Sequence, residues 1–169
     1  MRFVRLRFAL LLALPVMLTG CAFFTADITG VEAARIEEEE MNDAIARAQA
    51  TLEHFTTCLE DPDETQIYFA VRARFDVEEL GGFEDLWIEE VSWDGEQFTG
   101  ALAGEPQFWE GAVLGDSVTA PNDAVIDWMI VEETRIVGAY TVRVERDRLP
   151  LLERIDFSRQ LGLPIVDPE

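Results

Sequence analysis

The chain has 169 residues, with 34 acidic side chains against 13 basic ones, and its formal net charge is −21. Such an acidic excess argues against nucleic-acid binding and against electrostatic docking onto anionic lipid, because both need clustered cations. Hydrophobic residues make up 49% of the chain and aromatic residues 10%, so the sequence can bury a core and is no disordered acidic tail.

Residues 1–20 have the pattern of an export signal. Arg2, Arg5 and Arg7 stand at the start without any acid, and an apolar run follows as far as Leu18. A transmembrane helix needs about 20 apolar residues, and this run is shorter. A basic start, an apolar middle and small residues at the end are typical of a signal peptide.

Leu18-Thr19-Gly20-Cys21 resembles the lipobox of bacterial lipoproteins. The resemblance implies a diacylglycerol on the Cys21 thiol, cleavage before this residue and acylation of the new amine. Two or three acyl chains anchor a protein stably, whereas one gives marginal binding. We therefore expect a membrane-anchored protein with a lipidated tether over residues 21–35; the alternative is a plain cleaved signal. Because Ala22 rather than Asp follows the cysteine, the resemblance implies the periplasmic face of the outer membrane if the host has two membranes.

The rest of the chain, residues 36–169, reads as one α+β domain. Apolar residues at helical spacing from Met41 to Leu59 predict one N-terminal helix, which Pro62 ends. Alternating or short apolar runs predict strands over residues 67–75, 86–93, 97–102, 117–120, 126–131 and 136–144. Asp94-Gly95 is a strong hairpin signal. A short helix over residues 151–161 and a proline-bearing tail follow, so we expect the N-terminal helix to pack on a curled antiparallel sheet of five to six strands.

The sequence offers no convincing metal or nucleophilic site. His54 is the single histidine, and Cys58 stands four residues later on the predicted helix. Continuous helical phase places His54 nearly opposite the apolar stripe and Cys58 on its flank, so the two would face different surroundings. We expect no cofactor and no metal. With Cys21 lipidated, Cys58 is the remaining thiol, and it is expected to be buried rather than available for an intermolecular bond.

Two other sets of residues are candidates for function. Asp116 and Asp127 could do acid/base chemistry if burial separated their pKa values, although turn formation and capping explain them better. Phe108 and Trp109 stand in a glycine-bounded connection, residues 104–111, and could contact a partner, with Trp109 expected to be the exposed contact.

A further resemblance covers residues 66–148. It rests on Tyr68-Phe69-Ala70-Val71-Arg72-Ala73-Arg74-Phe75, Leu86-Trp87-Ile88-Glu89, Val91-Ser92-Trp93-Asp94-Gly95, Phe98-Thr99-Gly100, Gly115-Asp116-Ser117-Val118, Asp127-Trp128-Met129 and Val137-Gly138-Ala139-Tyr140-Thr141-Val142-Arg143-Val144. In this order the motifs resemble the YegJ-like bacterial domain of unknown function. Ala120 and Ile130 depart from the family pattern at positions that affect packing or surface. The resemblance implies no catalytic residue.

These observations lead to one main hypothesis and two alternatives. The main hypothesis is a lipid-anchored, non-catalytic binding or accessory protein of the cell envelope with a protein partner. One alternative is an envelope hydrolase that uses Asp116 and Asp127. The other, by analogy with small domains that pair with secreted toxins, is an immunity-like protein. The sequence identifies no small-molecule ligand.

Overall fold

The computed structural model describes residues 22–77 and 81–168. The signal peptide and the lipidation site at Cys21 lie outside these residues. The chain divides into two compact units, Met1–Glu37 and Glu38–Glu169, and the fold described below is that of the second. Within the described residues, no helix combines the length and the apolar character needed to cross a bilayer.

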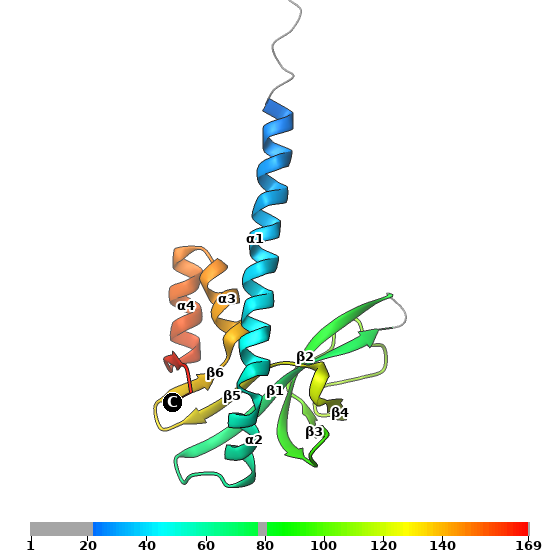
Figure 1. The fold of residues 1–169 in the computed structure, drawn as a ribbon, viewed down its shortest axis with the longest axis vertical. Helices are drawn as coiled ribbons and strands as arrows, with labels where there is room; N and C mark the ends of the chain where they lie inside the picture. The colour runs from blue at the N-terminus through cyan, green and yellow to red at the C-terminus, as the bar shows by residue number, and fades with distance from the viewer. Residues whose placement is uncertain (1–21, 78–80, 169) are drawn as a thin grey trace, which may run out of the picture. The chain divides into compact units, whose positions relative to one another are not determined.

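The protein is α+β, with helices before and after the main strands of a mixed sheet in chain order (Figure 1). In chain order the elements are α1 (Ala22–Ala50), α2 (Leu52–Glu60), β1 (Gln66–Val77), β2 (Gly82–Trp93), β3 (Gln97–Leu102), β4 (Ser117–Pro121), the 3-10 helix η2 (Asn122–Ala124), β5 (Val125–Glu132), β6 (Arg135–Gly138), α3 (Tyr140–Arg148), α4 (Leu151–Leu161) and β7 (Ile165–Val166). The strand order is β4-β3-β2-β1-β5-β6-β7. All neighbours are antiparallel except β6 and β7, which are parallel. The α+β class is confirmed, but the sheet has more strands than expected and is not purely antiparallel.

The core lies between one face of the sheet and two helical segments, α2 and the part of α1 after residue 37, which cross it in Figure 1. Phe55 on α2 is fully buried, and its ring centroid lies 5.5 Å from that of Trp128 on β5 and 5.9 Å from that of Phe98 on β3. The indole Nε1 of Trp128 donates a 3.0 Å hydrogen bond to the Ala48 carbonyl. Alternation along the strands places these large side chains on one face, where burial of each aromatic ring contributes roughly 1.5–3 kcal/mol.

The sheet is curled, as expected, and a bulge in β2 accounts for the bend. Pairing between β2 and β3 shifts register between Glu89 and Ser92, and Glu90 there has φ 53°. Gly100 on β3 permits the close approach, because a Cβ at this position would lie 2.5 Å from the Glu89 carbonyl oxygen. The bend brings β4 into contact with β1, although β2 and β3 separate them in the sheet.

The single helix predicted from Met41 to Leu59 is wrong, because α1 ends at Ala50 and α2 begins at Leu52. Thr51 lies between them with φ −110° and ψ 9°. Its hydroxyl donates to the Arg47 carbonyl at 2.9 Å and lies 3.1 Å from the Tyr140 hydroxyl. A side chain that bonds the backbone of the preceding turn competes with the helical ladder and bends the chain.

The position expected for His54 is also wrong. Its ring is partly buried with its centroid 5.9 Å from that of Trp128, and Nε2 lies 3.7 Å from the Cys58 sulfur. The expectation assumed one continuous helix; because α2 starts anew after Thr51, its residues do not keep the phase of α1. Cys58 is partly buried rather than fully buried.

The strand predicted over residues 136–144 ends at Gly138, and the remainder is helix α3. Ala139 has φ 50°, a left-handed conformation that turns the chain out of the sheet. The first backbone N–H groups of α3 then meet the buried carboxylate of Asp127, which accepts from Tyr140 N at 3.0 Å and Thr141 N at 2.8 Å. Periodicity could not predict this helix, since its cap comes from another strand.

The C-terminal region combines one confirmed and one corrected prediction. Helix α4 has the predicted bounds. The proline-bearing tail, however, contains the short strand β7, which Arg143 holds by donating to the Val166 carbonyl at 2.7 Å and to Asp167 Oδ1 at 2.6 Å. The hydrogen bond from Arg143 lowers the pKa of the Asp167 carboxyl.

Near the start of the described residues, helix α1 includes residues 22–35, which the sequence predicted as a lipidated tether. That this segment acts as a tether stays a prediction.

Candidate interaction surface

The loop between β3 and β4, residues 103–116, is held by a buried carboxylate. Glu84 near the start of β2 is 8% exposed, and its oxygens accept the backbone N–H groups of three consecutive residues. The donor–acceptor distances are 2.6 Å from Gln107, 3.1 Å from Phe108 and 3.2 Å from Trp109. Successive N–H groups that converge in this way form an anion-binding concavity, here filled by the protein's own side chain. The loop therefore has a defined conformation at its aromatic pair.

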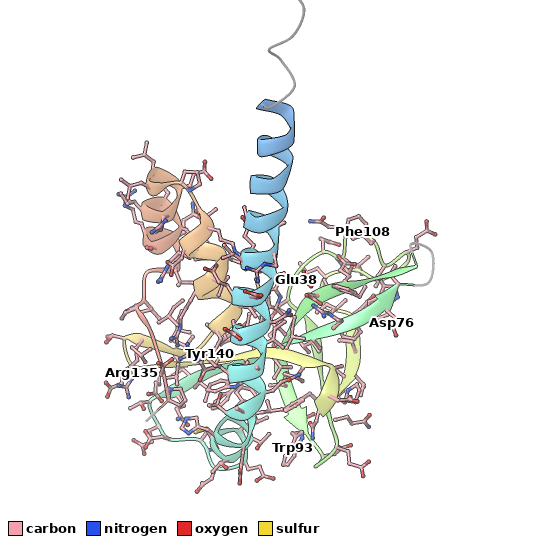
Figure 2. All side chains as sticks on the ribbon, turned by 45° about the horizontal axis from the view of Figure 1, so that its top comes forward. Glu38, Asp76, Trp93, Phe108, Arg135 and Tyr140 are labelled. Carbon is pink, nitrogen blue, oxygen red and sulfur yellow. The ribbon has the colours of Figure 1, made fainter. Side chains whose placement is uncertain are left out.

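The two aromatic residues of the pair have different positions. The Trp109 ring is partly buried, with its centroid 5.1 Å from that of Phe75 on β1. Phe108 is 49% exposed and lies near the end of β1, where Figure 2 also labels Asp76. Trp109 therefore anchors the loop on the sheet, and Phe108 is the residue presented to solvent. The sequence predicted both as partner contacts and favoured Trp109 as the exposed one, but Trp109 is partly buried and the geometry favours Phe108 for that role.

Further exposed apolar residues belong to the same loop. Val113 is 51% exposed and Leu114 is 53% exposed. We call Phe108, Val113 and Leu114 the apolar loop residues. Single exposed apolar residues are normal on a protein, and we treat the three within residues 103–116 as a candidate contact surface.

A groove of about 580 Å³ adjoins this loop and is open to solvent. Residues 109–112 of the loop line it on one side, and residues 116–119, which lead into and form most of β4, line it on the other. Its charged side chains are Glu110 and Asp116, both acidic. The groove thus combines a β-strand, part of an aromatic loop and negative charge.

The structure does not bring Asp116 and Asp127 into one site. Asp116 lies in the groove, where one carboxylate oxygen accepts the Val113 N–H at 2.9 Å. Asp127 is fully buried on β5, and β3, β2 and β1 stand between β4 and β5 in the sheet.

The Asp127 carboxylate accepts four hydrogen bonds. Besides the two N–H groups of α3, it accepts from Trp128 N at 2.8 Å and from the Thr141 hydroxyl at 2.6 Å. Burial raises the pKa of the Asp127 carboxyl, and these hydrogen bonds oppose the rise. The Thr141 oxygen in turn accepts from Arg72 Nη1 at 3.1 Å. Two of the four donors are the first backbone N–H groups of α3, so the arrangement supports a capping role.

Sequence reasoning missed Glu84 as a functional residue. The sequence did contain an indication. Glu84 stands two and four residues before Leu86 and Ile88 on one strand, so its side chain lies on the same face as their buried side chains. An acid in phase with core residues needs a partner for its charge, and the backbone of residues 107–109 supplies it.

His54 and Cys58 touch, but they gain no third group. In residues 22–77 and 81–168, no set of three His, Cys, Asp or Glu side chains is placed to hold a metal ion. The His54 ring lies instead beside the buried Trp128.

Comparison with known proteins gives a family without an established activity. A family model described as "Uncharacterized protein conserved in bacteria (DUF2314)" matches residues 38–165. The "Uncharacterized protein YegJ" of Escherichia coli is 25% identical over 130 residues, which cover 75% of this chain and 82% of that protein. No solved structure matches the chain.

A second relative is a longer protein. The "Putative ankyrin repeat protein" of Neisseria meningitidis serogroup B is 31% identical over 85 residues. The match covers 50% of this chain but only 34% of that relative, so the chain spans about a third of its length. The family model, in contrast, covers most of the α+β unit, and the chain therefore belongs to the DUF2314 family of uncharacterised bacterial proteins.

Proposed function

We propose that this protein is a lipid-anchored, non-catalytic protein of the cell envelope that binds a protein partner through the loop of residues 103–116. The observation that carries the proposal is the hydrogen bonding of Glu84 to three consecutive backbone N–H groups of this loop. A buried carboxylate used to fix an exposed loop preorganises the apolar loop residues, which lowers the entropy lost on binding.

The anchoring part of the proposal rests on sequence. Residues 1–20 have the signal pattern, and Leu18-Thr19-Gly20-Cys21 resembles a lipobox. A lipid on Cys21 would hold the protein at a membrane, at the periplasmic face of the outer membrane in a host with two membranes. The net charge of −21 disfavours direct binding to anionic lipid, so the membrane attachment in this proposal is the lipid on Cys21.

The hydrolase alternative has less support. Two catalytic carboxylates must both reach the substrate, and Asp127 is 0% exposed with both oxygens bonded inside the protein. An immunity-like protein, in contrast, also binds a protein partner. It differs from the main proposal only in that the partner is a toxin, so identifying the partner distinguishes the two.

One experiment in cells tests both parts of the proposal. The full chain would carry a photo-activated cross-linking residue at position 108 and be grown with a labelled fatty acid. We expect fatty-acid label on the protein, recovery in the membrane fraction and a discrete cross-linked partner. The Cys21→Ser chain should lose the label and leave the membrane fraction, whereas Cys58→Ser should keep both.

The matched control places the same cross-linking residue at position 64, an exposed residue of the α2–β1 connection. Equal cross-linking of the partner from positions 108 and 64 would contradict binding through the loop. Absence of cross-linking from position 108, and also from the same residue placed at position 113 or 114, would contradict it as well. Label retained on Cys21→Ser would contradict the anchor.

A further inference from the structure

Strand β4 leaves one side of the sheet unpaired. It is the terminal strand in the order β4-β3-β2-β1-β5-β6-β7, and among the described residues it pairs only with β3. Figure 1 shows it beside β3, away from the helices α3 and α4. An unpaired strand edge presents backbone donors and acceptors in a row, which is the geometry on which an additional strand forms.

The register identifies which backbone groups face outward. The Leu102 N–H donates to the Asp116 carbonyl at 2.9 Å, so this pair is in the hydrogen-bonded position. Antiparallel pairs alternate, and Val118, opposite Gly100, is therefore the next residue bonded to β3. It follows that Ser117 and Thr119 direct their N–H and C=O groups away from β3.

The groove described above lies along this strand. Ser117 and Thr119 have exposed side chains, whereas Val118 is buried, so the strand keeps its apolar side toward the core. Pro121 ends β4 and has no N–H to donate, which limits added pairing to the preceding residues. The groove therefore suits a short extended segment.

Charge decides what kind of segment fits. Glu110 and Asp116 are the ionisable groups that line the groove, and the whole chain carries −21. A second copy of this chain would bring the same acids together across the pair, which like-charge repulsion disfavours. A segment with basic side chains would instead be attracted to the groove.

We propose that the free side of β4 is a strand-addition site for an extended, basic segment of the partner protein. Its backbone pairs with Ser117 and Thr119, and its basic side chains face Glu110 and Asp116. The inference rests on the proposed binding function and specifies how the partner is held: main-chain hydrogen bonds give affinity, and the acidic groove selects charge.

The direct test uses a capped peptide of about ten residues that alternates arginine and valine, added to the full chain in detergent micelles. Amide hydrogen exchange, followed by NMR, should slow about tenfold at Ser117 and Thr119 and change little at Val118. A peptide of alternating glutamate and valine should bind at least about tenfold more weakly. An arginine–valine peptide N-methylated at every residue keeps the charge but cannot pair, and it should not protect these amides. An arginine–valine peptide N-methylated only at alternate residues keeps the N–H groups along one of its two edges, and it should still bind.

The protein variants are Thr119→Pro and its control Thr119→Val. Both remove the Thr119 hydroxyl, which lies 3.1 Å from the Thr99 hydroxyl, but only proline removes the outward N–H. We expect Thr119→Pro to weaken peptide binding about tenfold and Thr119→Val to change it less than about twofold. If Thr119→Pro does not fold, the N-methylated peptides decide the same question.

Several results would overturn the inference. Equal binding of the fully N-methylated peptide would show charge attraction without strand pairing. Absence of binding by the arginine–valine peptide would exclude the basic segment. Protection of Thr119 that rises with protein concentration alone would identify a second copy as the occupant. If folded Thr119→Pro still cross-links its partner from position 108 in cells, the strand-addition inference fails while the proposed function stands.

Discussion

At the scale of single residues, Glu84 links the core to the candidate surface. Its side chain is buried on β2, yet its bonding partners are backbone N–H groups of an exposed loop. A buried charge is tolerated only when hydrogen bonds compensate the lost hydration, so the side chain and the loop stabilise each other. Phe108 is presented to solvent as a consequence of this bonding.

We expect Glu84→Gln to loosen the loop without unfolding the sheet. The amide has one acceptor oxygen and no charge, so part of the bonding to residues 107–109 is lost. The free energy of unfolding should fall by about 2 kcal/mol, and the amides of residues 107–109 should exchange faster. Urea unfolding and hydrogen exchange measure the two effects.

The control is Glu96→Gln, because Glu96 is an exposed acid in the turn between β2 and β3. It should change the free energy of unfolding by less than about 0.5 kcal/mol. Equal exchange rates at residues 107–109 in Glu84→Gln and in the unchanged chain would show that the carboxylate does not hold the loop.

At the scale of elements, helix α3 depends on a cap from β5. Asp127 accepts the N–H groups of Tyr140 and Thr141 and the Thr141 hydroxyl, which also accepts from Arg72. These bonds connect β1, β5 and α3. The unpaired N–H groups at the start of a helix need acceptors, and here they come from a neighbouring strand instead of the preceding residue.

We expect Asp127→Asn to lower the free energy of unfolding by about 3 kcal/mol at neutral pH, because the amide nitrogen replaces an acceptor with a donor in a fully buried site. Urea unfolding measures the loss. Asp123→Asn is the control, since Asp123 is exposed in η2, and it should have a small effect. An equal loss in the two variants would contradict the capping role.

The loss of stability in Asp127→Asn should also depend on pH. Burial raises the pKa of Asp127 above its ordinary value of 3.8, so the unfolded state ionises first as the pH rises. The contribution of this group to stability is therefore complete below pH 3.8 and decreases as the pH rises through the raised pKa. The difference in the free energy of unfolding between the unchanged chain and Asp127→Asn should therefore be larger below pH 3.8 than above the raised pKa of Asp127.

At the scale of the whole molecule, charge is the dominant feature. The chain has 13 basic side chains and 34 acidic ones, and several of the basic ones form ion pairs. The bidentate pair of Arg74 with Asp85, at 2.8 and 2.9 Å, is one example. The remaining acids repel one another, which favours solubility but opposes the compact state.

We expect salt to stabilise the protein for this reason. The urea midpoint should be higher at about 300 mM NaCl than at about 20 mM, because screening shortens the range of the repulsion. KCl should act like NaCl if screening is the cause. A midpoint that falls with salt would mean that the ion pairs outweigh the repulsion.

The sequence by itself determined the elements whose pattern is local. Alternation predicted β1, Asp94-Gly95 predicted the β2–β3 hairpin, and the segment after Pro150 was predicted as the helix that is α4. It also marked residues 104–111 as the aromatic connection. Such patterns reflect which face of a segment is apolar, and the chain neighbours alone contain that information.

Tertiary structure decided the features whose bonding partners are distant in the chain. Thr51 interrupts the first helix where its hydroxyl meets Tyr140, and α3 replaces a predicted strand because Asp127 accepts its first N–H groups. Glu84 likewise selects Phe108 as the exposed aromatic residue. Each backbone N–H must find an acceptor once it is buried, and which acceptor is near depends on the folded sheet, so periodicity alone could not predict these three features.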